Sequence, residues 1–83
     1  MAFYRRLEDK MRILANNAKN MHLNELRAAW QRACDADPRY GAKVSGCQCV
    51  PDGWGRCEPC ERASMTTTTL ECVLESREKE QHQ

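Results

Sequence analysis

The stretch CQCVPDGWGRCEPC, residues 47–60, contains four of the six cysteines of this 83-residue chain. Cys47 and Cys49 form a first pair, and Cys57 and Cys60 form a second pair after seven intervening residues. Cys47 and Cys49 are two residues apart, so in an extended segment their side chains point the same way. A Cys-x2-Cys pair at a turn, such as Cys57 and Cys60, directs both sulfurs at one point. Because Pro and Gly between the pairs favour a tight turn, we predict a hairpin that brings the four sulfurs together.

Four thiolates that converge on one point form a tetrahedral zinc site, with each Zn–S bond near ~2.3 Å. We therefore predict that a structural Zn²⁺ ion binds Cys47, Cys49, Cys57 and Cys60, since four sulfurs leave no coordination position for water. Cys34 or Cys72 remains an alternative to one of these ligands, but as small apolar residues both are expected in the core. A [4Fe–4S] cluster on the same thiolates is a further alternative.

Two resemblances give other readings of the same cysteines. CQCVPDGWGRCE, residues 47–58, resembles the second half of an EGF-like module, which implies disulfides and an extracellular binding role. CEPC, residues 57–60, resembles the Cys-x-Pro-Cys of thioredoxin-like proteins, which implies redox catalysis between a strand and a helix. The first half of the EGF-like pattern is missing, and a run of threonines stands where the redox motif needs a helix, so we favour zinc.

Length and composition predict a small domain, residues 1–76, with a charged flexible tail over 77–83. A chain of this size with a mean hydropathy of −0.81 has little apolar surface to bury, so the metal is expected to replace part of the core. Charges interrupt the first twenty residues, as they would not in a signal peptide, and no run reaches transmembrane length. We expect a protein of the reducing cytoplasm that does not enter a membrane.

The N-terminal third predicts two amphipathic helices, over residues 3–18 and about 21–35, with apolar residues recurring at spacings of three and four. Asn20 is the expected N-cap of the second helix, whose apolar stripe includes Trp30. The asparagine-rich segment between the helices favours a helical hairpin over residues 1–36. One long helix that serves a homodimer remains open, as does the choice between monomer and dimer.

Thr68, Leu70, Cys72 and Leu74 alternate with their neighbours in a stretch of β-branched residues, which predicts a C-terminal strand over 66–74. The predicted fold class is therefore α+β, with the helical hairpin packed on a small zinc-ribbon-like β-hairpin. In this interpretation, the zinc hairpin and the strand span residues 44–75.

No pair of catalytic side chains and no phosphate-binding loop is recognisable, and we predict a protein that is not an enzyme. In size the chain resembles the small accessory proteins of phages and plasmids, which implies a regulator or inhibitor that binds a protein partner. We expect Trp54 and the outer helix face to make that contact. The alternative is direct nucleic-acid binding by basic residues of the first helix, which are Arg5, Arg6, Lys10, Arg12 and Lys19.

Overall fold

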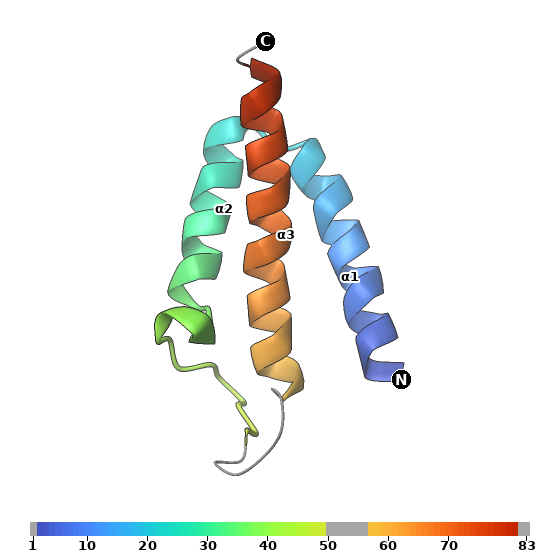
Figure 1. Cartoon of the computed structure of the whole chain (residues 1–83), viewed down its shortest axis with the longest axis vertical. Helices are drawn as coiled ribbons and strands as arrows, with labels where there is room; N and C mark the ends of the chain where they lie inside the picture. The colour runs from blue at the N-terminus through green and yellow to red at the C-terminus, as the bar shows by residue number, and fades with distance from the viewer. Residues whose placement is uncertain (1, 50–56, 82–83) are drawn as a thin grey trace.

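The described residues form three α-helices and one short 3₁₀-helix (Figure 1). The computed structural model describes residues 2–49 and 57–81. In chain order the elements are α1 (Ala2–Lys19), α2 (Leu23–Asp35), the 3₁₀-helix η1 (Pro38–Tyr40) and α3 (Glu58–Gln81). The helices run up, down and up, so that α1 and α3 point the same way and α2 runs against both.

The predicted fold class is wrong, because the described residues contain no strand and residues 66–74 lie within α3. Consequently, no strand of a zinc ribbon appears in the described part of 44–75. The threonines stay helical because they bond to the helix itself: the Thr66 hydroxyl donates to the Arg62 carbonyl at 2.7 Å, and the Thr67 hydroxyl donates to the Ala63 carbonyl at 3.2 Å. The helix buries Thr67 and Leu70, which are three residues apart, as a helical face requires.

The connection between α1 and α2 separates two helices, as the asparagines predicted. The N-cap, however, is His22 rather than Asn20: its ring Nδ1 accepts a hydrogen bond from the Asn24 backbone N–H at 3.2 Å. The side chain of Asn20 instead donates to the Asn16 carbonyl in the last turn of α1. The chain therefore reverses between the two helices, and one continuous helix is excluded.

The buried core lies where α1 and α2 converge, at the end of the molecule away from residues 47–49 (Figure 1). Its members are Ala18, Leu26, Leu70, Val73 and Leu74. Both N-terminal helices pack against α3, rather than mainly against each other as the predicted hairpin requires.

The last turns of α3 are tied to the other two helices by charged side chains. The Arg77 guanidinium donates to the carbonyl of Ala18 in α1 and to that of Met21 in the connection after it, and Arg27 of α2 pairs with Glu78 at 3.2 Å. Residues 77–81, predicted as the start of a flexible tail, therefore continue the helix.

Of three side chains expected in the core, one packs against it and two do not occupy the predicted position. Trp30 is partly buried against the core cluster, in agreement with the prediction. Cys72 is exposed, because its predicted inward position depended on the alternation of a strand, and Cys34 is only partly buried. Among the described helices, none combines the length and the apolar character that a membrane span needs.

Candidate metal centre

The four predicted cysteines meet at the end of the molecule where α3 begins (Figure 1). After η1 the chain turns at Gly41 (φ 88°) and Gly46 (φ 78°), in the left-handed region that glycine adopts without steric cost. These turns lead to Cys47 and Cys49. Cys57 directly precedes α3, and Cys60 lies in its first turn. A loop and a helix start thus supply one pair of sulfurs each.

The separations between the sulfurs match the coordination sphere of a single ion. All four Sγ atoms lie within 4.8 Å of one another. Four of the pairwise distances are 3.4 Å (Cys47–Cys60), 3.5 Å (Cys49–Cys57), 3.7 Å (Cys49–Cys60) and 3.9 Å (Cys47–Cys57). Ligands at ~2.3 Å from a tetrahedral ion are about 3.8 Å apart. The donor set therefore fits one zinc ion without a large rearrangement.

Backbone N–H groups also point at these sulfurs. The Gln48 N–H donates to the Cys57 Sγ at 3.2 Å, and the Cys57 N–H donates to the Cys49 Sγ at 3.4 Å. Such bonds stabilise the thiolate form, and the positive N-terminal end of α3 acts in the same direction. The backbone N–H groups and the helix N-terminus therefore offset part of the negative charge of the thiolates even without a bound cation.

The ionisation of the four thiols is strongly interdependent. The Gln48 N–H, followed by hydrogen bonding within the cluster, lowers the pKa of Cys57 to about 6. The pKa of Cys60 is raised, chiefly by its contact with the Cys47 sulfur and then by burial. Four negative charges this close repel one another, and a divalent cation removes that repulsion.

The geometry also bears on the alternatives. A [4Fe–4S] cluster binds each thiolate to a different iron, which needs sulfurs farther apart than the ligands of one ion. The EGF-like reading needs disulfides, but all six cysteines are free and S–S distances of 3.4 Å or more exceed a bond of ~2.05 Å. The thioredoxin-like reading gains one element, since CEPC does open a helix, but the described residues contain no strand to precede it.

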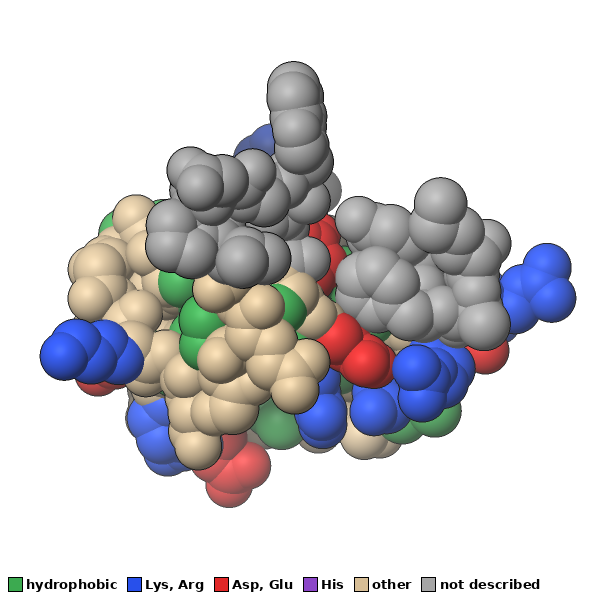
Figure 2. Space-filling view, turned by 90° about the horizontal axis from the view of Figure 1, so that it is seen from below, with side chains coloured by type: hydrophobic (Ala, Val, Ile, Leu, Met, Phe, Trp, Pro, Cys, Tyr) green, Lys and Arg blue, Asp and Glu red, His purple; other side chains and the backbone are tan. Residues whose placement is uncertain are grey.

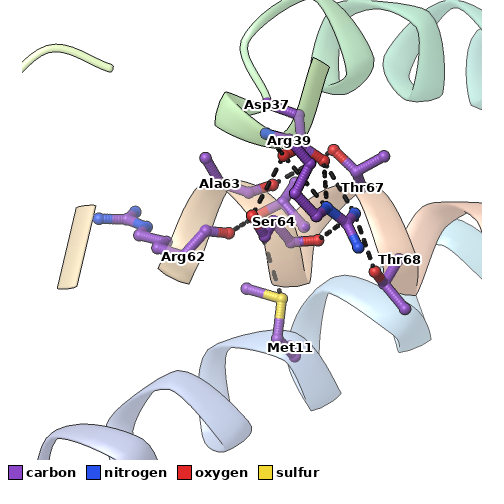
Figure 3. A network of polar contacts seen from close by, with 9 residues as sticks. Met11, Asp37, Arg39, Arg62, Ala63, Ser64, Thr67 and Thr68 are labelled. Atoms are coloured by element: carbon purple, nitrogen blue, oxygen red, sulfur yellow. Dashed lines mark hydrogen bonds and ion pairs between the residues drawn. The ribbon is translucent and has the colours of Figure 1, made fainter. Parts of the chain in front are cut away.

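A polar network that the sequence analysis missed attaches the start of the cysteine loop to α3 (Figure 3). Asp37 is fully buried and accepts hydrogen bonds from the Arg39 guanidinium, at 2.8 Å for Nη2, and from the Ser64 hydroxyl at 3.1 Å. Arg39 also donates to the Ser64 carbonyl and the Thr68 hydroxyl. The signal in the sequence was Asp37-Pro38-Arg39, an acidic cap before a turn, but the buried partners come from α3 and could not be read locally.

This network predicts an acid-sensitive contribution to stability. Burial opposes ionisation of Asp37, but the hydrogen bonds from Arg39, Thr67 and Ser64 outweigh it and lower the pKa from 3.8 to about 2. The stabilisation is therefore complete above pH 4 and is lost as the pH falls toward 2. Allowing for the partly exposed Arg39, the contribution is about 1–2 kcal/mol.

We expect Asp37→Asn to be less stable than the wild type at pH 6, with the difference closing as the pH approaches 2. Urea unfolding at several pH values measures this difference, and any loss of metal in acid affects both proteins alike. A gap that stays constant from pH 6 to 2 would show that the carboxylate charge does not contribute.

The predicted partner-binding residues are dispersed rather than gathered into one site. Arg5, Arg6, Lys10, Arg12 and Lys19 are all exposed on α1. Arg12 pairs with Asp9 at 3.8 Å, and Arg6 pairs with Glu58 at 3.6 Å. Seen from the cysteine end, blue basic side chains lie on both sides of the molecule with red acidic ones beside several of them (Figure 2). Trp54 lies outside the described residues.

In comparisons with protein-family models, curated proteins and solved structures, the chain matches none.

Proposed function

We propose that this chain is a small, non-catalytic zinc protein, an adaptor or regulator that acts by binding another protein. The observation that supports it best is the set of four sulfurs within 4.8 Å, which together fill the coordination sphere of one zinc ion. A zinc ion with four thiolates has no open position for water or substrate, so its role is structural. It would hold the loop after η1 against the start of α3.

Direct nucleic-acid binding by α1 is the second candidate. Its support is the exposure of Arg5, Arg6, Lys10, Arg12 and Lys19 along one helix. Two of these five side chains already pair with carboxylates, and aromatic side chains do not alternate with them as on a stacking surface. We therefore favour a protein partner over a nucleic acid.

The dependence of binding on salt separates the two functions. Five phosphate contacts would give a log–log slope of about −4 on duplex DNA, so a DNA-binding role predicts strong binding that falls steeply with salt. We expect only weak DNA binding that disappears near physiological salt, about 0.15 M. Fluorescence anisotropy on a labelled duplex measures it.

The same test includes the capture of partner proteins from nuclease-treated lysate by the zinc-loaded protein. The variants are Trp54→Ala and Arg5/Arg12/Lys19→Glu. We expect a stoichiometric protein complex that survives both nuclease and physiological salt. Tight DNA binding that only the charge-reversed variant loses, with capture abolished by nuclease, would establish the nucleic-acid function instead.

A further inference from the structure

Helices α1 and α2 diverge toward the cysteine end, on either side of α3 (Figure 1). Two hollows, of about 560 and 410 Å³, lie against α2 and α1 respectively. Both are lined by Arg62 and Thr66 of α3. Because they share these two residues, the hollows are neighbours along α3, which forms the floor of both, and we refer to them together as the groove.

The groove is mainly apolar and has the dimensions of a helix. Ala33 and Ala36 line the α2 side, and Met11, Ile13 and Leu14 line the α1 side. The small alanine side chains keep the groove wide. Its floor, residues 59–66 of α3, extends about 10 Å at ~1.5 Å per residue, which corresponds to about two helical turns. A short amphipathic helix fits a groove of this kind.

Ile13 is the clearest sign that this surface is incomplete. Its side chain is 62% exposed, although it lines the groove next to the partly buried Leu14. The other exposed large hydrophobic side chain of the described residues, Tyr40 at 64%, lies outside both hollows. Because the Ile13 side chain adjoins the apolar lining of the groove, it extends a contiguous apolar surface, and contiguous apolar surface is a feature of recognition sites.

The charged side chains that line the groove favour an acidic partner over a second copy of this chain. Lys10 and Arg62 line it, whereas its one acidic residue, Glu58, is paired with Arg6 at 3.6 Å. The net charge of this set is therefore positive. A second copy docked groove to groove would bring Lys10 and Arg62 near their own equivalents, which repulsion disfavours. Acidic side chains on both sides of an apolar stripe would complement them.

We propose that this groove binds an amphipathic α-helix of a partner protein, with apolar residues on one face and Asp or Glu on its flanks. The proposal rests on the proposed protein-binding function and identifies the kind of partner. Val44 and Pro59, which also line the groove, are within three residues of the cysteines, so a zinc ion bound there would hold part of the groove wall in place.

The probe is a set of three displayed peptide libraries, each of helical 16-residue sequences with a randomised apolar face. The positions that flank the apolar face are Glu in the first library, Gln in the second and Lys in the third. Selection is made on zinc-loaded full-length protein at about physiological salt. We expect helices from the Glu library to be enriched. Ile13→Asp should weaken their binding at least about tenfold, as for the loss of a central apolar anchor.

Matched variants locate the binding. Tyr40→Asp, an equally exposed hydrophobic residue outside the groove, should leave affinity within about twofold. Lys10→Glu should weaken binding several-fold and more so at low salt, whereas Lys79→Glu, on the last turns of α3, should have little effect. Circular dichroism and zinc content confirm that each variant is folded and loaded, so a failure of the metal centre is distinguished from a failure of the groove.

Results of three kinds would overturn the proposal. In the first, no library yields binders to protein that is folded and carries zinc. In the second, the Gln or Lys library enriches as well as the Glu library, or the selected helices bind Ile13→Asp as tightly as the wild type. In the third, sedimentation shows a dimer that Ile13→Asp dissociates, which would make a second copy the occupant.

Discussion

Replacing Cys60 with serine is expected to weaken zinc binding by about a hundredfold or more and so to lower the zinc content of the purified protein below one ion per chain. Cys60 is buried to 4% exposure, and its sulfur is 3.4 Å from that of Cys47 and 3.7 Å from that of Cys49. A structural zinc site contributes ~10–16 kcal/mol through four ligands, so the loss of one ligand weakens binding by about 3 kcal/mol, or a hundredfold or more. Serine also leaves a buried hydroxyl at the start of α3.

Cys72→Ser is the matched control for this variant. Cys72 is on the same helix but is exposed and is not among the four clustered cysteines, so it should keep both the zinc and the thermal stability of the wild type. Zinc content by elemental analysis and a thermal melt are the measurements. Release of zinc by Cys72→Ser, with zinc retained by Cys60→Ser, would show that the ligand set is wrong.

Removal of the metal is expected to unfold the cysteine end while the helical core persists. The core cluster contains Leu26, Leu70 and Val73 and lies at the opposite end of the molecule, so it does not need the ion to be buried. No residue of the described loop, 41–49, belongs to the core cluster or packs against it, so we expect the loop to depend on the metal site. We expect the thermal midpoint to fall by more than about 10 °C, because a ligand that binds only the folded state is lost.

Hydrogen exchange on chelator-treated protein tests this division directly. The amides of Gln48 and Cys57, which donate to cysteine sulfurs, should lose protection, whereas those of Leu70 to Leu74 should stay protected. Uniform loss of protection along α3 would mean that the ion stabilises the whole fold. No change at Gln48 and Cys57 would mean that the loop does not depend on a metal.

The cluster of four cysteines could be predicted from the sequence because it depends on local spacing. Cys47 with Cys49, and Cys57 with Cys60, are close in the chain, and glycines permit the turns that precede the first pair. Each pair converges whether a hairpin or a helix start presents it. For that reason the predicted cysteines are the ones that meet, although the β-hairpin expected to carry them does not occur in the described residues.

The prediction of a strand is wrong because the alternation spans too few residues to distinguish a strand from a helix. Alternation over Thr68, Leu70 and Cys72 fits a strand, but Ser64, Thr67 and Leu70 recur at three residues and are all buried on one helix face. The β propensity of threonine was overridden by hydroxyl bonds to the preceding turn and by packing against α1 and α2.

Features that depend on residues far apart in the chain could not be predicted. The Asp37 network needs Ser64 and Thr68, and the groove needs α1 and α2 to diverge over α3. In the sequence, Ile13 is simply a hydrophobic residue beside the core stripe. Its position next to an apolar hollow becomes evident only in three dimensions.

X-ray absorption at the zinc edge, on protein purified without added metal, tests the central claim most directly. We predict one zinc per chain with four sulfur neighbours near ~2.3 Å and no light-atom ligand, as the four cysteines require. A spectrum that needs nitrogen or oxygen ligands would contradict the all-cysteine centre. So would metal-free protein whose cysteines react with an alkylating agent only after reduction, because that result would show disulfides in place of a metal.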